Sequence, residues 1–178
     1  MFKSTILLVP GLGNSNEDHW QSYWEKQYHL QRVNQHNWKT PNCEDWVSVL
    51  DKTILQYNIN DVILVGHSLA CATISHWAHL YLRNVKAALL VAPADTEAIN
   101  FPTGTTGFAP MSLHKLFFPS IVVASTNDQY VSLAKANYFA DCWGSQFINI
   151  GNEGHINSES QLNDWKFGVN LLQQLDNL

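Results

Sequence analysis

Residues 62–65 (VILV) are apolar at every position and run directly into Gly66-His67-Ser68-Leu69-Ala70. A strand that is apolar on both faces is typical of a parallel sheet covered by helices on either side. The residues that follow Ser68 predict a helix, so the chain should turn sharply from strand to helix at this serine. The segment therefore favours an α/β fold built on a parallel sheet.

Short apolar runs alternate with longer amphipathic segments along the whole chain. Strands are predicted at residues 5–9, 32–35, 62–65, 85–91, 121–124 and 147–150. Helices are predicted at residues 17–30, 43–57, 68–82, 132–142 and 160–175, the second with Asn42 as its N-cap. This alternation predicts a compact α/β fold of about six mainly parallel strands with helices on both faces.

The length of 178 residues fits a single domain with its own hydrophobic core. No repeat, low-complexity tract or interdomain linker is found, so we interpret residues 1–178 as one domain. One irregular stretch, residues 93–115, is rich in proline and glycine. Loops of this length in compact domains are usually functional or disordered, and we interpret 93–115 as a candidate short lid.

Charge and hydropathy narrow the class of protein. Ten Lys plus Arg against fifteen Asp plus Glu give a net charge of -5, which argues against nucleic-acid binding because that function needs a basic face. No apolar run approaches the roughly 20 residues of a membrane span, and residues 5–9 are too short for a signal-peptide core. Cys43, Cys71 and Cys142 are widely spaced, which predicts free thiols rather than disulfides or a zinc site. We therefore expect a cytoplasmic protein acting on a small molecule, without a membrane or nucleic-acid partner.

Ser68 is the first candidate catalytic residue. A serine on a tight turn between a buried strand and a helix presents its hydroxyl beyond the sheet edge, which suits a nucleophile in acyl transfer. The flanking Gly66 permits a crowded turn, and Ala70 replaces the more usual glycine two residues after the serine. The alternative interpretation is a serine that only caps the helix.

A serine nucleophile needs a base, and the base needs a carboxylate that orients it. His155 lies in a glycine-containing loop just after the last predicted strand, whereas a structural or surface role is expected for the other seven histidines. Asp128 follows the penultimate strand, and Asp95 is the competing acid. The order Ser68, Asp128, His155 is the one expected for α/β-hydrolases, which favours Asp128.

The loop after the first strand, Pro10-Gly11-Leu12-Gly13-Asn14, should supply one backbone donor to a reaction oxyanion. We predict that the N–H groups of Leu12 and Leu69 form the oxyanion hole. Gly11, Gly13 and His67 are predicted substrate-binding residues. A dinucleotide-binding loop is the alternative, but its third glycine is replaced by Asn16.

These motifs resemble the small α/β-hydrolase family of serine hydrolases named for retinoblastoma-binding protein 9. The resemblance covers nearly the whole chain and rests on the Val9-Pro10-Gly11 start, Trp20 and Trp24, and the motifs Gly66-His67-Ser68-Leu69-Ala70, Ser125-Thr126-Asn127-Asp128 and Gly154-His155. It implies Ser68 as nucleophile, Asp128 as acid and His155 as base, with no metal and no organic cofactor. The short Leu-x-Cys-x-Glu motif behind the namesake's retinoblastoma-type partner is absent here, so that partner is not carried over and the sequence lets us infer no protein partner.

The sequence thus predicts a serine hydrolase that cleaves a small ester, amide or thioester through an acyl-Ser68 intermediate. An acyltransferase would use the same residues and differ only in the group that accepts the acyl chain. The second class of alternative is a binding protein without catalysis, in which tryptophans such as Trp20, Trp24 and Trp143 form a recognition surface.

Overall fold

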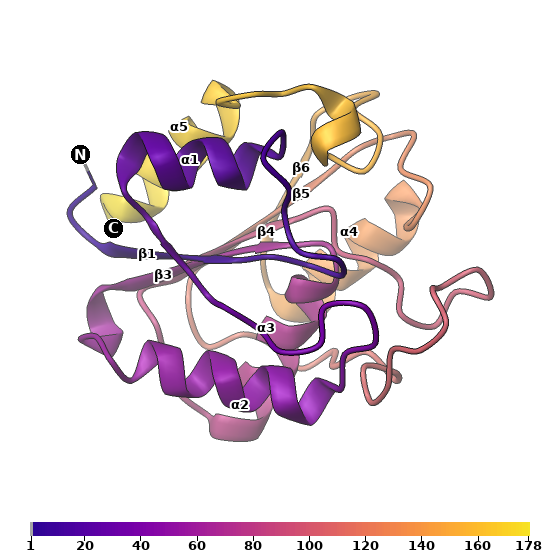
Figure 1. Ribbon diagram of the computed structural model, residues 1–178, viewed down its shortest axis with the longest axis horizontal. Helices are drawn as coiled ribbons and strands as arrows, with labels where there is room; N and C mark the ends of the chain where they lie inside the picture. The colour runs from indigo at the N-terminus through magenta and orange to yellow at the C-terminus, as the bar shows by residue number, and fades with distance from the viewer. Residues whose placement is uncertain (1) are drawn as a thin grey trace.

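The computed structural model describes residues 2–178, which form one six-stranded sheet with helices on both sides (Figure 1). The strand order is β2-β1-β3-β4-β5-β6, and all five pairings are parallel. The strands are β1 (Thr5–Val9), β2 (Gln31–Arg32), β3 (Val62–His67), β4 (Ala87–Val91), β5 (Ser120–Ala124) and β6 (Gln146–Asn149). The helices are α1 (Trp20–Tyr28), α2 (Cys43–Ile54), α3 (Leu69–Tyr81), α4 (Leu133–Trp143) and α5 (Lys166–Asp176). The predicted compact α/β fold, with about six parallel strands and helices on both faces, is confirmed.

Both faces of the sheet are buried, because side chains alternate between two hydrophobic clusters. In β3, Val62 and Leu64 belong to the cluster that includes residues of α2, α3 and α4, whereas Ile63 and Val65 belong to the cluster with residues of α1 and α5. Figure 1 shows α1 and α5 on one side of the sheet and α2 and α3 on the other. This explains why the β3 segment is apolar at every position.

The tryptophans named as a recognition surface belong to the core. Trp20 is 1% exposed, and Trp24 and Trp143 are fully buried. The Trp20 and Trp24 rings pack edge to face, with centroids 4.7 Å apart. These three side chains therefore stabilise the fold and offer no docking surface.

Helix ends differ from the sequence expectation where the backbone is left-handed. Asn42 caps α2 as predicted, with its side chain accepting from the Asp45 N–H at 3.2 Å. The last helix, however, starts at Lys166 rather than residue 160, because Gln161, Asn163 and Trp165 have positive φ angles that a right-handed helix cannot contain. Within residues 2–178, no helix combines the length and the apolar character needed to cross a membrane.

Residues 93–115, predicted as a candidate lid, contain neither a helix nor a strand. Phe108 and Met111 are nevertheless buried in the cluster beneath α2 and α3. Phe101 and Pro102, earlier in the segment, line the pocket described below. The segment is thus anchored at one end in the core and contributes a wall to the pocket at the other.

The three cysteines are free thiols, as their spacing predicts. Cys43 and Cys71 are buried, and burial raises the pKa of the Cys43 thiol to about 12. Burial also raises the pKa of Cys71 far above its ordinary value. Neither thiol is therefore a nucleophile near neutral pH.

Candidate active site

The parallel sheet brings the predicted site residues to one edge. Leu12 follows β1, Ser68 follows β3, Asp128 follows β5 and His155 follows β6. Because all strands run in the same direction, the loops at their carboxyl ends gather along the same edge of the sheet. Residues far apart in the sequence therefore meet in one pocket.

Ser68 lies in a strained backbone conformation, with φ 58° and ψ -121°. It occupies the N-cap position of α3, but its side chain makes no capping hydrogen bond. Its N–H donates to the Val91 carbonyl at 2.9 Å, which fixes the turn. The hydroxyl is therefore free for another partner, and the capping interpretation does not account for this serine.

Two glycines allow the crowding around this turn. A Cβ on Gly66 would lie 2.7 Å from Ile74 Cδ1, so any side chain there requires the end of the Ile74 side chain to move. A Cβ on Gly11 would lie 2.7 Å from the His67 carbonyl and 3.0 Å from Ser68 Cβ. Gly11, predicted to bind substrate, thus supports the turn and is not part of the pocket wall.

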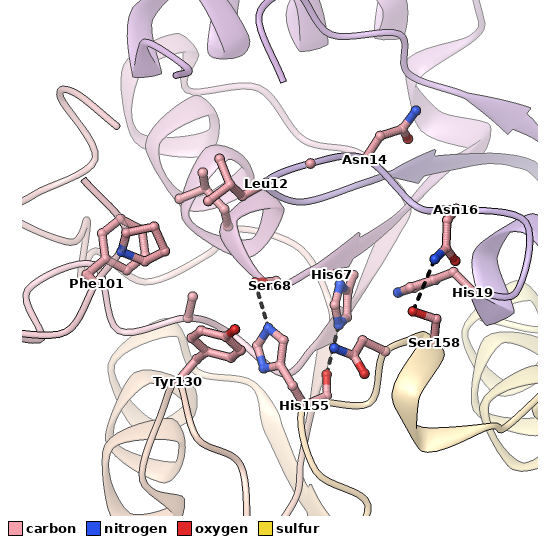
Figure 2. A pocket seen from close by; sticks show the side chains of 15 residues that line it. Leu12, Asn14, Asn16, His19, His67, Ser68, Phe101, Tyr130, His155 and Ser158 are labelled. Carbon is pink, nitrogen blue, oxygen red and sulfur yellow. Dashed lines mark hydrogen bonds between the residues drawn. The ribbon is translucent and has the colours of Figure 1, made fainter. Parts of the chain in front are cut away.

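The hydroxyl of Ser68, the imidazole of His155 and the carboxylate of Asp128 form a continuous hydrogen-bonded chain. Ser68 Oγ lies 2.8 Å from His155 Nε2, as Figure 2 shows. His155 Nδ1 lies 2.9 Å and 2.8 Å from the two Asp128 oxygens. The ionised carboxylate can only accept, so Nδ1 carries the proton and Nε2 is the acceptor that faces the serine.

Burial and backbone contacts hold the acid in place. The Asp128 side chain is fully buried, and the Tyr130 N–H donates to its Oδ1 at 2.8 Å. The Tyr130 ring also packs against the His155 ring, with centroids 4.5 Å apart. Asp95, the alternative acid, lies 3.8 Å from the Lys135 ammonium and makes no contact with the histidine.

The residues just before Asp128 position the loop that carries His155. Asn127 Oδ1 accepts from the Gly154 N–H at 2.7 Å, and Ser125 Oγ accepts from the Glu153 N–H at 2.9 Å. The Thr126 N–H donates to the Gly151 carbonyl at 2.7 Å. The acid and the base are therefore held by loops that are fastened to each other.

The two predicted oxyanion donors both line the pocket. Leu69 is the first residue of α3, so its N–H has no partner inside the helix. Among residues 2–178, the N–H of Leu12 also donates to no backbone carbonyl. Both N–H groups are thus available to a negatively charged oxygen beside Ser68, and the positive end of α3 favours that charge.

Gly13 and His67, the other predicted substrate-binding residues, also line the pocket. His67 has a second contact that the sequence did not reveal, since its Nε2 lies 2.9 Å from the His155 carbonyl. A carbonyl accepts, so Nε2 carries the proton of His67. Burial, followed by the neighbouring His19 and His155, lowers the pKa of His67 well below its usual range. His67 is therefore neutral and steadies the backbone of the base.

The pocket around Ser68 measures about 300 Å³, and none of its lining side chains is Lys, Arg, Asp or Glu. Leu12, Phe101 and Tyr130 lie on one side of Ser68 in Figure 2, and Asn14, Asn16, His19 and Ser158 on the other. We call these the apolar wall and the polar wall. Their residues were not singled out from the sequence, apart from Leu12, because loop packing rather than a local motif brings them together.

Comparison with known proteins agrees with the fold. A crystal structure from Pectobacterium atrosepticum, of a protein assigned as a YdeN-like hydrolase, shares 31% identity and a TM-score of 0.83, covering 97% of this chain and 90% of that one. The ydeN gene product of B. subtilis shares 20% identity and a TM-score of 0.77, with coverages of 99% and 100%. Est1E of Butyrivibrio proteoclasticus, solved with ferulic acid, shares 12% identity and a TM-score of 0.72, with coverages of 97% and 90%. No curated protein sequence matches the chain significantly.

The sheet, its covering helices and these structural neighbours define an α/β-hydrolase. Residues 6–174 match the family model described as Serine hydrolase. The match spans nearly the whole chain, and the chain belongs to this serine hydrolase family.

The buried histidines make stability depend on pH. Burial, and then the charge of Arg32, lowers the pKa of His19 to about 3 from an ordinary value of 6.5, and the pKa of His67 is lowered too. As the pH falls below about 6.5, these histidines therefore become protonated in the unfolded chain before they do in the folded one. The stability of the folded state, which is full above that pH, decreases as the pH falls towards the folded-state pKa. Between about pH 7 and pH 5, we expect His19 to lower the free energy of unfolding by roughly 2 kcal/mol, and we expect His67 to lower it further.

Urea unfolding followed by tryptophan fluorescence at several pH values would measure this loss. A His19→Asn variant should show a shallower dependence on pH, because one of the two groups is removed. Equal slopes for the variant and the wild type would contradict the prediction for His19.

Proposed function

We propose that this chain is an esterase that hydrolyses small uncharged carboxylic esters through an acyl-Ser68 intermediate. The observation that carries the proposal is the hydrogen-bonded chain from Ser68 Oγ through His155 to Asp128. A hydroxyl within hydrogen-bond reach of an oriented base favours catalysis over a binding-only role. The resemblance of the sequence motifs to those of the family named for retinoblastoma-binding protein 9 supports the same assignment of roles.

In the first half of the reaction, His155 Nε2 takes the Ser68 proton while Oγ attacks the ester carbonyl carbon. The carbonyl oxygen becomes an oxyanion, which the N–H groups of Leu12 and Leu69 stabilise. The tetrahedral intermediate collapses when the protonated His155 gives its proton to the leaving alkoxide. An alcohol leaves, and the acyl group stays on Ser68.

In the second half, His155 takes a proton from water, and the resulting hydroxide equivalent attacks the acyl carbon. Collapse of the second intermediate breaks the bond to Ser68 Oγ, which regains its proton from His155. A carboxylic acid leaves. Asp128 keeps its negative charge throughout and stabilises the imidazolium each time it forms. Transfer to an alcohol instead of water would start from the same acyl-Ser68.

The pocket supports the substrate class. Its volume of about 300 Å³ is at the small end of ligand sites. No charged side chain lines it, so a charged substrate would lose hydration without gaining an ion pair. A small neutral ester meets both conditions.

Labelling with a fluorescent fluorophosphonate tests the proposal, because such probes react with activated serines. The folded wild-type chain should be labelled at Ser68, and Ser68→Ala should abolish labelling. Ser48→Ala, in α2 and outside the pocket, is the matched control and should label like the wild type. Labelling that persists in Ser68→Ala, or a folded wild type that does not react, would overturn the proposal.

A further inference from the structure

One buried hydrogen-bond donor in the pocket wall has no partner. His19 is the N-cap of α1, and its Nδ1 accepts from the Gln21 N–H at 3.1 Å. The ring proton of neutral His19 must therefore be on Nε2. Nε2 has no hydrogen-bond partner among residues 2–178, although the residue is only 4% exposed. Leaving a buried N–H unpaired is unfavourable, so a partner from outside the chain would be stabilising.

The His19 ring is part of the polar wall, and its Nε2 is buried beside the His67 ring with almost no exposed surface. Its centroid lies 4.7 Å from that of His67, whose ring in turn lies 5.0 Å from that of His155. Figure 2 shows the ring pointing toward His67, with Asn16 and Ser158 beside it. A group held by His19 therefore lies in the same pocket as an ester at Ser68.

The charges around His19 select the type of partner. The low pKa of His19 keeps the ring uncharged near neutral pH, so it offers an N–H without a positive charge. The nearby cation, Arg32, is already paired with Glu25 at 2.7 Å and donates to Asn14 Oδ1 at 2.8 Å. A carboxylate would thus be desolvated without a free cation, whereas a neutral oxygen would satisfy the donor.

The polar wall can admit such an oxygen at little cost. Asn16 Nδ2 and Ser158 Oγ connect the two loops beside His19 through an exposed hydrogen bond of 3.4 Å. This distance is beyond the usual range for N–H···O bonds, so the contact is weak. A substrate oxygen must displace this contact to reach His19 Nε2, which has almost no exposed surface.

We propose that His19 is a specificity-determining residue whose Nε2–H donates to a neutral acceptor oxygen, such as a ketone or ether, elsewhere on the ester substrate. The inference rests on the proposed function, because it concerns the substrate of the same site. It predicts that the enzyme prefers esters with a second, uncharged oxygen over esters of equal shape without one.

Two pairs of esters of matched shape test the preference on the wild type. The first pair carries the oxygen on the acyl side: p-nitrophenyl 4-oxopentanoate against p-nitrophenyl 4-methylpentanoate. The second carries it on the alcohol side: 2-methoxyethyl acetate against butyl acetate. We expect kcat/KM to favour the oxygen-bearing ester about tenfold in one of the pairs, as for one satisfied buried donor.

The variant His19→Asn separates recognition from helix capping. Asparagine is a good N-cap and keeps the acceptor for the Gln21 N–H, but its side chain is too short to replace Nε2. The variant should lose the preference through slower hydrolysis of the oxygen-bearing ester, with the matched ester changed little. The control is His29→Asn at the other end of α1, where the φ of 54° suits asparagine. This control should keep the preference.

The outcomes distinguish this inference from the proposed function. If the wild type hydrolyses all four esters without preference within either pair, the role of His19 is wrong and the esterase proposal stands. The same holds if a folded His19→Asn variant keeps the full preference. If the wild type hydrolyses none of them, the proposed function itself fails. Because the first comparison uses only the wild type, the test does not depend on the variant folding.

Discussion

Ser68→Ala and His155→Ala should each lower kcat for p-nitrophenyl acetate by about 10⁴- to 10⁶-fold. Ser68 Oγ and His155 Nε2 lie 2.8 Å apart, and the proposed mechanism makes them one catalytic unit, because the hydroxyl is a nucleophile only when the imidazole takes its proton. Stopped-flow or long-time-course absorbance at the nitrophenolate band would measure the rates. The residual rate should reflect the oxyanion donors and substrate binding alone.

The double variant gives a sharper test of this unit. If the residues act together, Ser68→Ala combined with His155→Ala should be no slower than either single variant. His114→Ala, which removes an exposed histidine, is the control and should keep nearly full activity. A His155→Ala variant that retained more than about a tenth of the wild-type kcat would contradict the assignment of the base.

Asp128→Asn should lower kcat by about 10⁴-fold while leaving the fold intact. The asparagine amide can donate to His155 Nδ1, which places the ring proton on Nε2 and removes the acceptor that Ser68 needs. The loss should appear mainly in kcat, with KM changed little, because Asp128 is buried behind the histidine and does not line the pocket. Steady-state kinetics with the same ester measures both constants.

Asp95→Asn is the matched control for this substitution. Asp95 was the competing acid in the sequence, and its carboxylate faces Lys135 at 3.8 Å rather than His155. Because this ion pair is partly exposed to solvent, it contributes little to stability, and the variant should keep most of its activity. A larger loss in Asp95→Asn than in Asp128→Asn would show that the acid had been assigned wrongly.

The sequence predicted the fold and the site best at positions where one physical requirement restricts the type of residue. A strand buried on both faces must be apolar throughout, and β3 was predicted from that pattern with its start correctly placed at Val62. The positions just after β3, β5 and β6 pointed to Ser68, Asp128 and His155, because parallel strands deliver their following loops to the same edge. This argument predicts that the three side chains lie close together, but it does not give the distances between them.

The features that the sequence did not reveal depend on contacts between distant segments. The start of α5 was placed too early, since nothing local marks the left-handed residues Gln161, Asn163 and Trp165. A structural or surface role was expected for His19, yet it lies in the pocket wall because the loop before α1 folds against the loop that carries Ser158. The one feature of the sequence that indicated a place near the site was the position of His19 in the loop after β1, at the carboxyl edge of the sheet.

The order in which the site residues occur along the chain has a consequence for biosynthesis. Ser68 and its turn are complete once β3, β4 and α3 have formed, but the loop that carries His155 follows β6, the edge strand that pairs with β5. While β6 is still inside the ribosome, the part of the nascent chain that can fold therefore contains the serine but not its base. Under the proposed mechanism, hydrolysis can begin only after the last strand has docked, so we expect the appearance of turnover to report the end of folding rather than its early steps.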